Sequence, residues 1–307
     1  MTAVEVHEQT PPDRGRDKVS PADPTQHEGR GRWALEKVLL VGVGLFFLFP
    51  AFWMLLTSLK ELQSIYANPP QFWGFDVIFS NYRDVFFERS GSGEFSQLLR
   101  FFGNSVIITS VATLFATLLG VPAAWAYSRF EVKGKKDQLF FILSTRFMPP
   151  VVVVIPLFLA FRELSLYDTK VGLVLLYTAF NIPFTVWMMK GFVDEIPVEY
   201  EDAAMVDGYS RVQAFTKVSL PLLIPGILAT AVFSLIFTWN EFAFAVFLTQ
   251  DGARTVPPAI AGLIGGQQTP WGLVAASAMV FAIPVLVFGY LVRNHLVAGM
   301  TFGAVRR

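Results

Sequence analysis

The stretch VEYEDAAMVDGYSRVQAFTKVSLPLLIPG, residues 198–226, gives the strongest clue to the fold of this chain. It is the most charged run after the N-terminal tail, and it lies between long apolar segments. Residues 199–207 predict a short helix, which Gly208 ends because glycine accepts a positive φ without steric cost. Ser210 stands where a second short helix needs its N-cap, and Leu220-Pro221 is expected to stop that helix. The sequence therefore predicts two short helices between two apolar segments.

Composition indicates a membrane protein. Of the 307 residues, 53% are hydrophobic and only 16% are charged, whereas soluble domains average about 25% charged residues. Runs of about 20 apolar residues, the length that spans a bilayer, recur at residues 37–59, 104–127, 138–161, 171–189, 222–248 and 271–292. We predict an all-α membrane protein with six transmembrane helices. The zero net charge gives no sign of nucleic-acid binding, and the absence of cysteine excludes disulfides and thiolate metal sites.

The segments between the apolar runs predict the topology. Residues 1–32 are polar with no apolar core, so they are expected to be a disordered cytoplasmic tail ahead of a permease domain at residues 33–307. Residues 60–103 are too charged for lipid and predict an external loop with short helices. Lysine and arginine concentrate at both termini and in residues 129–137, which favours cytoplasmic termini and a cytoplasmic loop at residues 194–221.

The spacing within the charged stretch is specific. Asp202-Ala203-Ala204 is followed by three residues, Gly208, nine further residues and Val218-Ser219-Leu220-Pro221. This pattern resembles the EAA loop of binding-protein-dependent ABC importer permeases, with Asp202 in place of the usual Glu and Val218 in place of the usual Ile. The resemblance covers roughly residues 33–307 and is closest to the sugar and polyol branch, which contains the smaller maltose permease subunit. It also rests on Asn104-Ser105, Met148-Pro149, Ile155-Pro156-Leu157, residues 166–169, Ile182-Pro183-Phe184, Ile196-Pro197 and Trp239-Asn240-Glu241-Phe242.

The resemblance implies the type I ABC importer transmembrane fold in the bacterial cytoplasmic (inner) membrane. It implies a homologous second permease subunit, two ATP-binding cassette ATPases that hold ATP and Mg, and an external solute-binding protein, periplasmic or lipid-anchored. The EAA-like loop would be the coupling helix that docks on an ATPase. The residues assigned to that coupling are Glu201, Asp202, Ala203, Ala204, Asp207 and Gly208.

The sequence contains no set of residues typical of catalysis. It lacks the GxxxxGK[ST] pattern that holds nucleotide phosphates. Its histidines, His7, His27 and His295, form no cluster with metal-ligand spacing. We therefore expect no enzyme activity and no cofactor bound by this chain, and any ATP hydrolysis falls to a partner subunit.

Polar residues inside the apolar runs are the candidates for a substrate pathway. Arg146 either faces a cavity or a partner acid, or reaches back to the cytoplasmic interface. Asn181, beside Pro183, is either a substrate contact or part of the core. Asn240 and Glu241 either line the pathway or have a structural or gating role, such as bonding across helices. Aromatic faces for a sugar would come from Tyr177, Phe180 or Trp187. The pathway set is Arg146, Tyr177, Asn181, Trp239, Asn240 and Glu241.

These features favour one functional hypothesis over two others. The favoured one is a permease subunit that imports a sugar, polyol or sugar derivative by ATP-driven alternating access. A self-sufficient secondary transporter would show internal repeats and more intramembrane acids than Glu241 alone. An integral membrane enzyme would need a catalytic constellation. The sequence leaves open the solute and its contacts, the sister permease, the identity of the two ATPases and the role of the tail.

Overall fold

The computed structural model describes residues 25–88, 93–265 and 268–302, and these form helices joined by loops, with one isolated β-bridge between Phe87 and Phe95. In this part of the chain, four helices are long and apolar enough to cross a membrane. They are α1 (Thr25–Ser58), α4 (Gln97–Arg129), α7 (Lys170–Asp194) and α14 (Trp271–Phe302). Two bent helix pairs bring the number of crossings to six if each pair is one span, so the described residues agree with the predicted all-α membrane fold.

The first bent pair replaces the predicted continuous span at residues 138–161. Helix α5 (Lys135–Ser144) and the 3₁₀ turn η1 (Thr145–Phe147) meet α6 (Pro150–Glu163) at 88°. Met148 adopts an extended conformation between them, as expected because a residue before proline avoids the α region. Here the consecutive prolines break the span instead of only interrupting its hydropathy.

The second bent pair agrees with the expectation that Leu220-Pro221 stops the helix that follows Ser210. Helix α9 (Arg211–Ala214), the π-helical η2 (Phe215–Ser219) and α10 (Leu220–Leu222) form one continuous run, and the chain bends by 74° before α11 (Ile224–Trp239). Pro221 lies one residue before the end of this run, in which Ser219 and Leu220 keep helical dihedral angles. The run therefore ends beside the proline, which disfavours continuation of a helix, and only the π-helical turn before it was not predicted.

The predicted fifth span at residues 222–248 is too long. Helix α11 ends at Trp239, and α12 (Ala243–Leu248) begins after a break. The side chain of Asn240 donates to the carbonyl of Ile236 at 2.8 Å, whereas Glu241 accepts from the amides of Phe244 and Ala245. Two polar side chains thus end one helix and cap the next.

Two further boundaries differ from the sequence predictions. The second span begins at Gln97 instead of residue 104, because Ser96 caps α4 by accepting from the amide of Leu99. Residues 25–32 of the predicted tail belong to α1, and residues 1–24 lie outside the described part. The predicted external loop contains the short helices α2 (Leu62–Ile65) and α3 (Ser80–Phe86), and the predicted outside loop before the last span contains α13 (Val256–Gly262).

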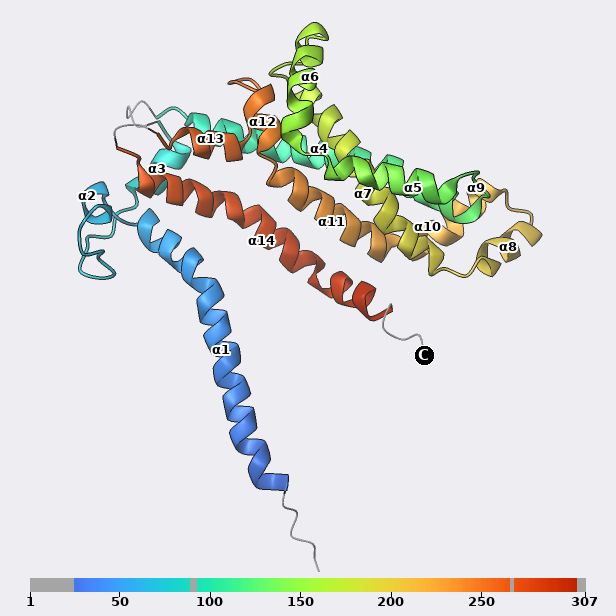
Figure 1. Ribbon diagram of the computed structural model, residues 1–307, viewed down its shortest axis with the longest axis horizontal. Helices are drawn as coiled ribbons and strands as arrows, with labels where there is room; N and C mark the ends of the chain where they lie inside the picture. Colours follow the sequence, from blue (N-terminus) through green and yellow to red (C-terminus); the bar gives the residue numbers. More distant parts are fainter. Residues whose placement is uncertain (1–24, 89–92, 266–267, 303–307) are drawn as a thin grey trace, which may run out of the picture. The chain divides into compact units, whose positions relative to one another are not determined.

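The core of residues 53–307, a compact unit separate from residues 1–52, is built on α4 and α7. The two helices run side by side in Figure 1. At their contact, a Cβ on Gly120 would lie 2.5 Å from Cγ2 of the buried Thr185, so only glycine permits this approach. Apolar clusters lie on either side: one around Ile108, Leu173 and Phe244, the other around Trp125, Met189 and Leu223.

Candidate coupling site and membrane cavity

The EAA-like stretch folds as the two short helices that the sequence predicts. Helix α8 (Glu199–Val206) carries three acidic residues in its first turn, where the helix dipole favours negative charge. Gly208 follows with φ of +90°, which confirms its role as a breaker. Ser210 then caps α9 in a capping box with Gln213. The turn between the helices is therefore fixed by local chemistry.

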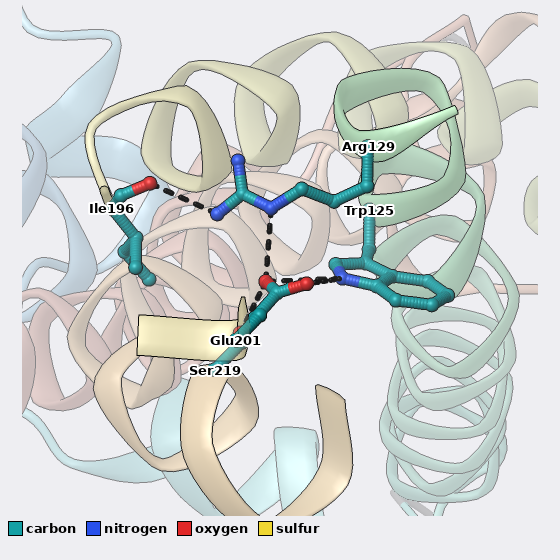
Figure 2. A network of polar contacts seen from close by, with 5 residues as sticks. All are labelled: Trp125, Arg129, Ile196, Glu201 and Ser219. Carbon is teal, nitrogen blue, oxygen red and sulfur yellow. Dashed lines mark hydrogen bonds and ion pairs between the residues drawn. The ribbon is translucent and has the colours of Figure 1, made fainter. Parts of the chain in front are cut away.

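Glu201 attaches α8 to the end of α4 (Figure 2). Its Oε1 accepts from Nε of Arg129 at 2.9 Å and from Oγ of Ser219, and Nε1 of Trp125 donates to Oε2 at 3.1 Å. Nη2 of Arg129 also donates to the carbonyl of Ile196 at 2.9 Å, just before α8. Three elements, α4, α8 and η2, thus converge on one carboxylate, and we call Trp125, Arg129, Glu201 and Ser219 the Glu201 clamp.

The clamp is buried and charged. Glu201 is 5% exposed, and burial by itself raises the pKa of its carboxyl. Hydrogen bonds from Ser219, Arg129 and Trp125, together with the charge of Arg129, more than reverse this and hold the pKa of Glu201 below its ordinary value. The carboxylate is therefore ionised at neutral pH. A buried pair that lost one partner would leave an uncompensated charge.

Aromatic packing surrounds the clamp. The Trp125 ring lies 4.7 Å from the Phe215 ring in η2 and 5.3 Å, edge to face, from the Phe130 ring. The guanidinium of Arg211 lies over Phe130 at 5.5 Å. The π-helical turn of η2 carries both Phe215 and Ser219 toward α4, so the irregular helix and the clamp belong to one packed unit.

The coupling residues assigned from sequence divide between two faces of α8. Glu201 and Ala204 point inward and are buried, whereas Asp202, Ala203, Asp207 and Gly208 are exposed. Of the two small residues assigned to coupling, only Ala203 is therefore exposed, since neighbouring residues on a helix point in different directions. Val206, which was not among the residues assigned to coupling, is 88% exposed and adds an apolar side chain to the outer face.

A second site lies where two spans break. A cavity of about 200 Å³ is bordered by the break between η1 and α6, by α7, and by the break between α11 and α12. Its lining residues are Arg146, Met148, Pro150, Tyr177, Phe180, Asn181, Phe237, Thr238, Glu241 and Phe244. Irregular backbone at membrane depth is tolerated where it lines a cavity, and this geometry fits that rule. We call it the break cavity.

Hydrogen bonds connect the polar walls of the break cavity. The Tyr177 hydroxyl donates to Oε2 of Glu241 at 2.6 Å. Nδ2 of Asn181 donates to the carbonyl of Tyr177 and, at 2.7 Å, to Oγ1 of Thr238. Helices α7, α11 and α12 are thereby joined around the cavity by side chains that the sequence had singled out.

Arg146 lines this cavity. Its Nη1 donates to the carbonyl of Phe180 at 3.0 Å, and its guanidinium lies 4.5 Å from the ring of Phe237 and 5.2 Å from that of Phe184. Among the described residues no carboxylate forms an ion pair with it. Arg146 is thus a cation held by aromatic faces and one carbonyl.

The other pathway candidates lie elsewhere. Trp239 is buried against α14, where its Nε1 donates to the carbonyl of Phe281 and its ring stacks on that of Phe281. Asn240 is exposed and bonds its own helix. Of the proposed aromatic faces, Tyr177 and Phe180 line the break cavity, whereas Trp187 lines a different cavity of about 600 Å³.

The structure also gives a role to passages that the sequence analysis left without one. Asp168, between α6 and α7, accepts from the amides of Gln250, Gly252 and Ala253. Burial by itself raises the pKa of Asp168. The backbone hydrogen bonds lower it by more than burial raises it, so the pKa lies below the ordinary value. Asn104 donates to the carbonyls of Gly252 and Arg254. These two side chains fix the loop after α12.

Trp125 and Arg129 were missed because nothing local marks them, and Ser219, although it belongs to the EAA-like pattern, was not linked to Glu201. Arg129 was read as part of a basic loop, and its partner Glu201 lies 72 residues away in sequence. A buried tryptophan with an indole N–H needs an acceptor, but the sequence does not say which. The available signal was Glu201, a carboxylate beside the motif Asp, which was assigned to coupling without its partners in α4 and η2.

Comparisons with known proteins agree with this architecture. Residues 116–301 match the family model described as "Binding-protein-dependent transport system inner membrane component". The chain is 36% identical over 277 residues to the trehalose transport system permease protein SugB of Mycobacterium tuberculosis, covering 89% of this chain and 97% of that protein. It is 32% identical to the trehalose/maltose transport system permease protein MalG of Thermococcus litoralis, covering 84% and 91%.

A solved structure shares the fold. It is a chain of a bacterial ABC transporter involved in the import of the acidic polysaccharide alginate, with a TM-score of 0.71 at 22% identity. The match covers 92% of this chain and 99% of that one. The overall helical fold of this chain is therefore a known architecture.

Proposed function

The chain belongs to the family of binding-protein-dependent transport system inner membrane components, so it is a multi-pass permease subunit of an ABC importer, and we propose that it imports a saccharide. In transporters of this family the ATPase is a separate subunit, so this chain is not an enzyme. The proposal adds the substrate class, the docking surface and the partner set. It includes a second permease, two ATPases with ATP and Mg, and an external solute-binding protein. Both termini are taken to be cytoplasmic.

The outer face of α8 is the proposed docking surface for an ATPase. Its exposed residues combine acidic Asp202 and Asp207 with small Ala203 and apolar Val206. In this proposal Val206, which is 88% exposed, is the apolar side chain that enters the partner's groove, as in helix-in-groove docking. Gly208, at a positive φ, keeps the following turn close to this face.

The single observation that carries this proposal is the Glu201 clamp. A helix that transmits force must be attached firmly to the spans behind it, and Glu201 joins α8 to α4 through a buried ion pair. Helix α8 is thus anchored to the membrane helices through Glu201 on its inner face and leaves its outer face exposed. This arrangement suits a lever between an ATPase and the membrane helices. Glu201 then acts as a positioning residue, and Asp202 is the acidic group left for the partner.

The saccharide class is supported by relatives and by the break cavity. The relatives are named for trehalose and for trehalose or maltose transport, and the cavity offers both hydrogen-bonding groups and aromatic faces. The pathway through this subunit would therefore pass Arg146, Tyr177, Asn181 and Glu241, and not Trp239 or Asn240.

The docking proposal is tested by substitution on the outer face of α8. Val206→Asp should abolish co-purification of the ATPase from mild detergent and ATP-dependent sugar uptake by proteoliposomes, while the permease remains in the membrane. Val212→Asp, the same change at an exposed position of α9 instead of α8, is the matched control and should retain most of both. If Val206→Asp retains ATPase binding, the outer face of α8 does not dock as proposed. Uptake without any ATPase would instead indicate a secondary transporter.

A further inference from the structure

The hydrogen-bonding groups left open in the break cavity identify the kind of ligand it suits. Arg146 has five N–H donors, and one of them is used, on the carbonyl of Phe180. The Oδ1 of Asn181 accepts no hydrogen bond within the described part of the chain, since both hydrogen bonds of this side chain are donated by Nδ2. Oε1 of Glu241 accepts from one amide, which leaves room for a second donor.

These open groups include both donors and acceptors. A hydroxyl can accept from Arg146 and donate to Asn181 or Glu241 at the same time, whereas a carboxylate or sulfonate could satisfy only Arg146 and would be repelled by Glu241. An apolar ligand would leave the guanidinium without its remaining partners, at a cost in free energy. The polar walls therefore match a neutral polyhydroxyl compound.

The apolar walls and the volume narrow the choice. Phe180 and Phe244, with ring centroids 4.7 Å apart, lie on the cavity together with Phe237, and aromatic faces suit the C–H groups of a sugar ring. Drug-sized ligands occupy cavities of roughly 300–1,000 Å³, whereas this one has about 200 Å³. The space suits one ring and not two.

We propose that the break cavity is a subsite in this subunit for a single neutral sugar ring of the transported saccharide, with Arg146 as donor and Glu241 and Asn181 as acceptors. The inference rests on the proposed saccharide import and adds that this subunit itself contacts the solute. Since the cavity lies between two helix breaks, a change in either bend alters its walls. The subsite can therefore hold the sugar in one conformation of the importer and release it in another.

The absence of cysteine from the chain allows a direct test. Phe180→Cys places the only thiol of this subunit in the break cavity, and Trp187→Cys places it on the same helix in the separate cavity. The whole importer, with its sister permease, ATPases and binding protein, is reconstituted in proteoliposomes. A panel of trehalose, maltose, diacetylchitobiose, mannitol and glucuronate is screened for ATP-dependent uptake. The solute with the fastest uptake is then used to protect the thiols against a membrane-permeant maleimide, detected by mass spectrometry of this subunit.

The expected result is at least tenfold slower labelling of Phe180→Cys when the transported sugar and its binding protein are present with a hydrolysis-deficient ATPase, and unchanged labelling of Trp187→Cys. Met148→Cys, on the other wall of the cavity and 47% exposed, should be protected likewise, and it replaces Phe180→Cys if that variant does not assemble. ATP-dependent uptake of a sugar with equal labelling of both cavities would overturn the subsite while leaving saccharide import standing. No ATP-dependent uptake of any saccharide in the panel would overturn both.

A second measurement concerns Arg146. Arg146→Gln should raise the sugar concentration for half-maximal uptake on the order of 10–100-fold, the effect of losing one charged hydrogen bond, at an unchanged amount of protein in the membrane. Arg162→Gln on α6, outside the cavity and exposed, should leave it unchanged. Equal effects of the two substitutions would refute a direct contact between Arg146 and the sugar.

Discussion

Replacing Glu201 by glutamine tests the central assumption of the coupling mechanism, because it changes one atom and removes one charge. Glu201 accepts from Arg129, Ser219 and Trp125 through its two oxygens. Glutamine has one acceptor oxygen, and its amide N–H₂ group would face either the indole N–H of Trp125 or the guanidinium. At least one donor therefore loses its acceptor, and the Arg129 charge loses its counter-ion.

The size of the effect follows from burial. The side chains of Arg129 and Glu201 are 11% and 6% exposed, so solvent replaces little of what is lost. Removing one partner of a buried pair typically costs about 3–5 kcal/mol, and glutamine keeps one hydrogen bond, so we expect about 3 kcal/mol. Since 1.4 kcal/mol is a factor of ten in an equilibrium constant, local opening of the coupling segment should become on the order of 100-fold more frequent.

Hydrogen–deuterium exchange of the assembled importer measures this opening directly. Peptides that cover residues 199–222 should exchange on the order of 100-fold faster in Glu201→Gln, whereas peptides from the centre of α4 should be unchanged. In the same sample, the sugar-loaded binding protein should no longer stimulate ATP hydrolysis, although basal hydrolysis by the ATPases continues.

Asp202→Asn is the matched control because it makes the same chemical change one residue away. Asp202 is exposed and forms no part of the clamp, so its substitution should leave exchange within about twofold while weakening ATPase docking. Equal exchange rates in wild type and Glu201→Gln would show that the clamp does not hold α8, and the lever would have to be attached in another way.

Three further substitutions test other parts of the structure. Gly208→Val should abolish sugar uptake while the amount of permease in the membrane stays normal, because φ of +90° costs an L-residue about 1–2 kcal/mol or more. Gly208→Asn should have a milder effect. Normal uptake by the valine variant would show that the left-handed turn is not required. Because the folded pKa of Asp168 is lowered, its stabilisation is present above the unfolded pKa of about 3.9 and is lost as pH falls through the folded pKa. In wild type, the amides that Asp168 binds should thus lose hydrogen-exchange protection only at strongly acidic pH. In Asp168→Asn, the same amides should lack this protection at every pH. An identical pH profile in the two proteins would contradict a stabilising role of the Asp168 charge. Gly120→Val should lower the melting temperature in detergent by several degrees by forcing α4 from Thr185, whereas Gly103→Ala, which meets nothing within 4 Å, should not.

Local features of this chain could be predicted from sequence because their causes are local. Gly208 breaks a helix and Ser210 caps one through residues at most a few positions away. The end of the second helix beside Pro221 has a local cause as well, because proline disfavours continuation of a helix and the chain bends after Leu222, but the π-helical turn at Phe215–Ser219 was not predicted. Hydropathy likewise found the apolar runs but not the break at Glu241, where a single carboxylate caps a new helix.

The site depended on contacts that sequence periodicity does not reveal. Glu201 and Asp202 are adjacent acids in one motif, yet one is buried against α4 and the other faces outward. What separates them is the position of Arg129, far away in the chain. The pathway residues show the same limit: Tyr177 and Glu241 meet although 64 positions separate them, whereas Trp239 turns to α14.

The contacts between the clamp and the break cavity form a continuous packed line, and this bears on how one site can affect the other. Trp125 lies on α4 little more than a turn from Gly120, which touches Thr185 on α7 so closely that no Cβ would fit. The hydroxyl of Thr185 in turn lies 3.4 Å from the hydroxyl of Ser234 on α11. Thr185 is also one helical turn along α7 from Asn181, which lines the cavity. Close-packed helices of this kind transmit displacement because they resist compression. A movement of α8 is therefore expected to reach the cavity as a joint displacement of α4 and α7, and the two breaks beside the cavity are where the chain can bend to accommodate it.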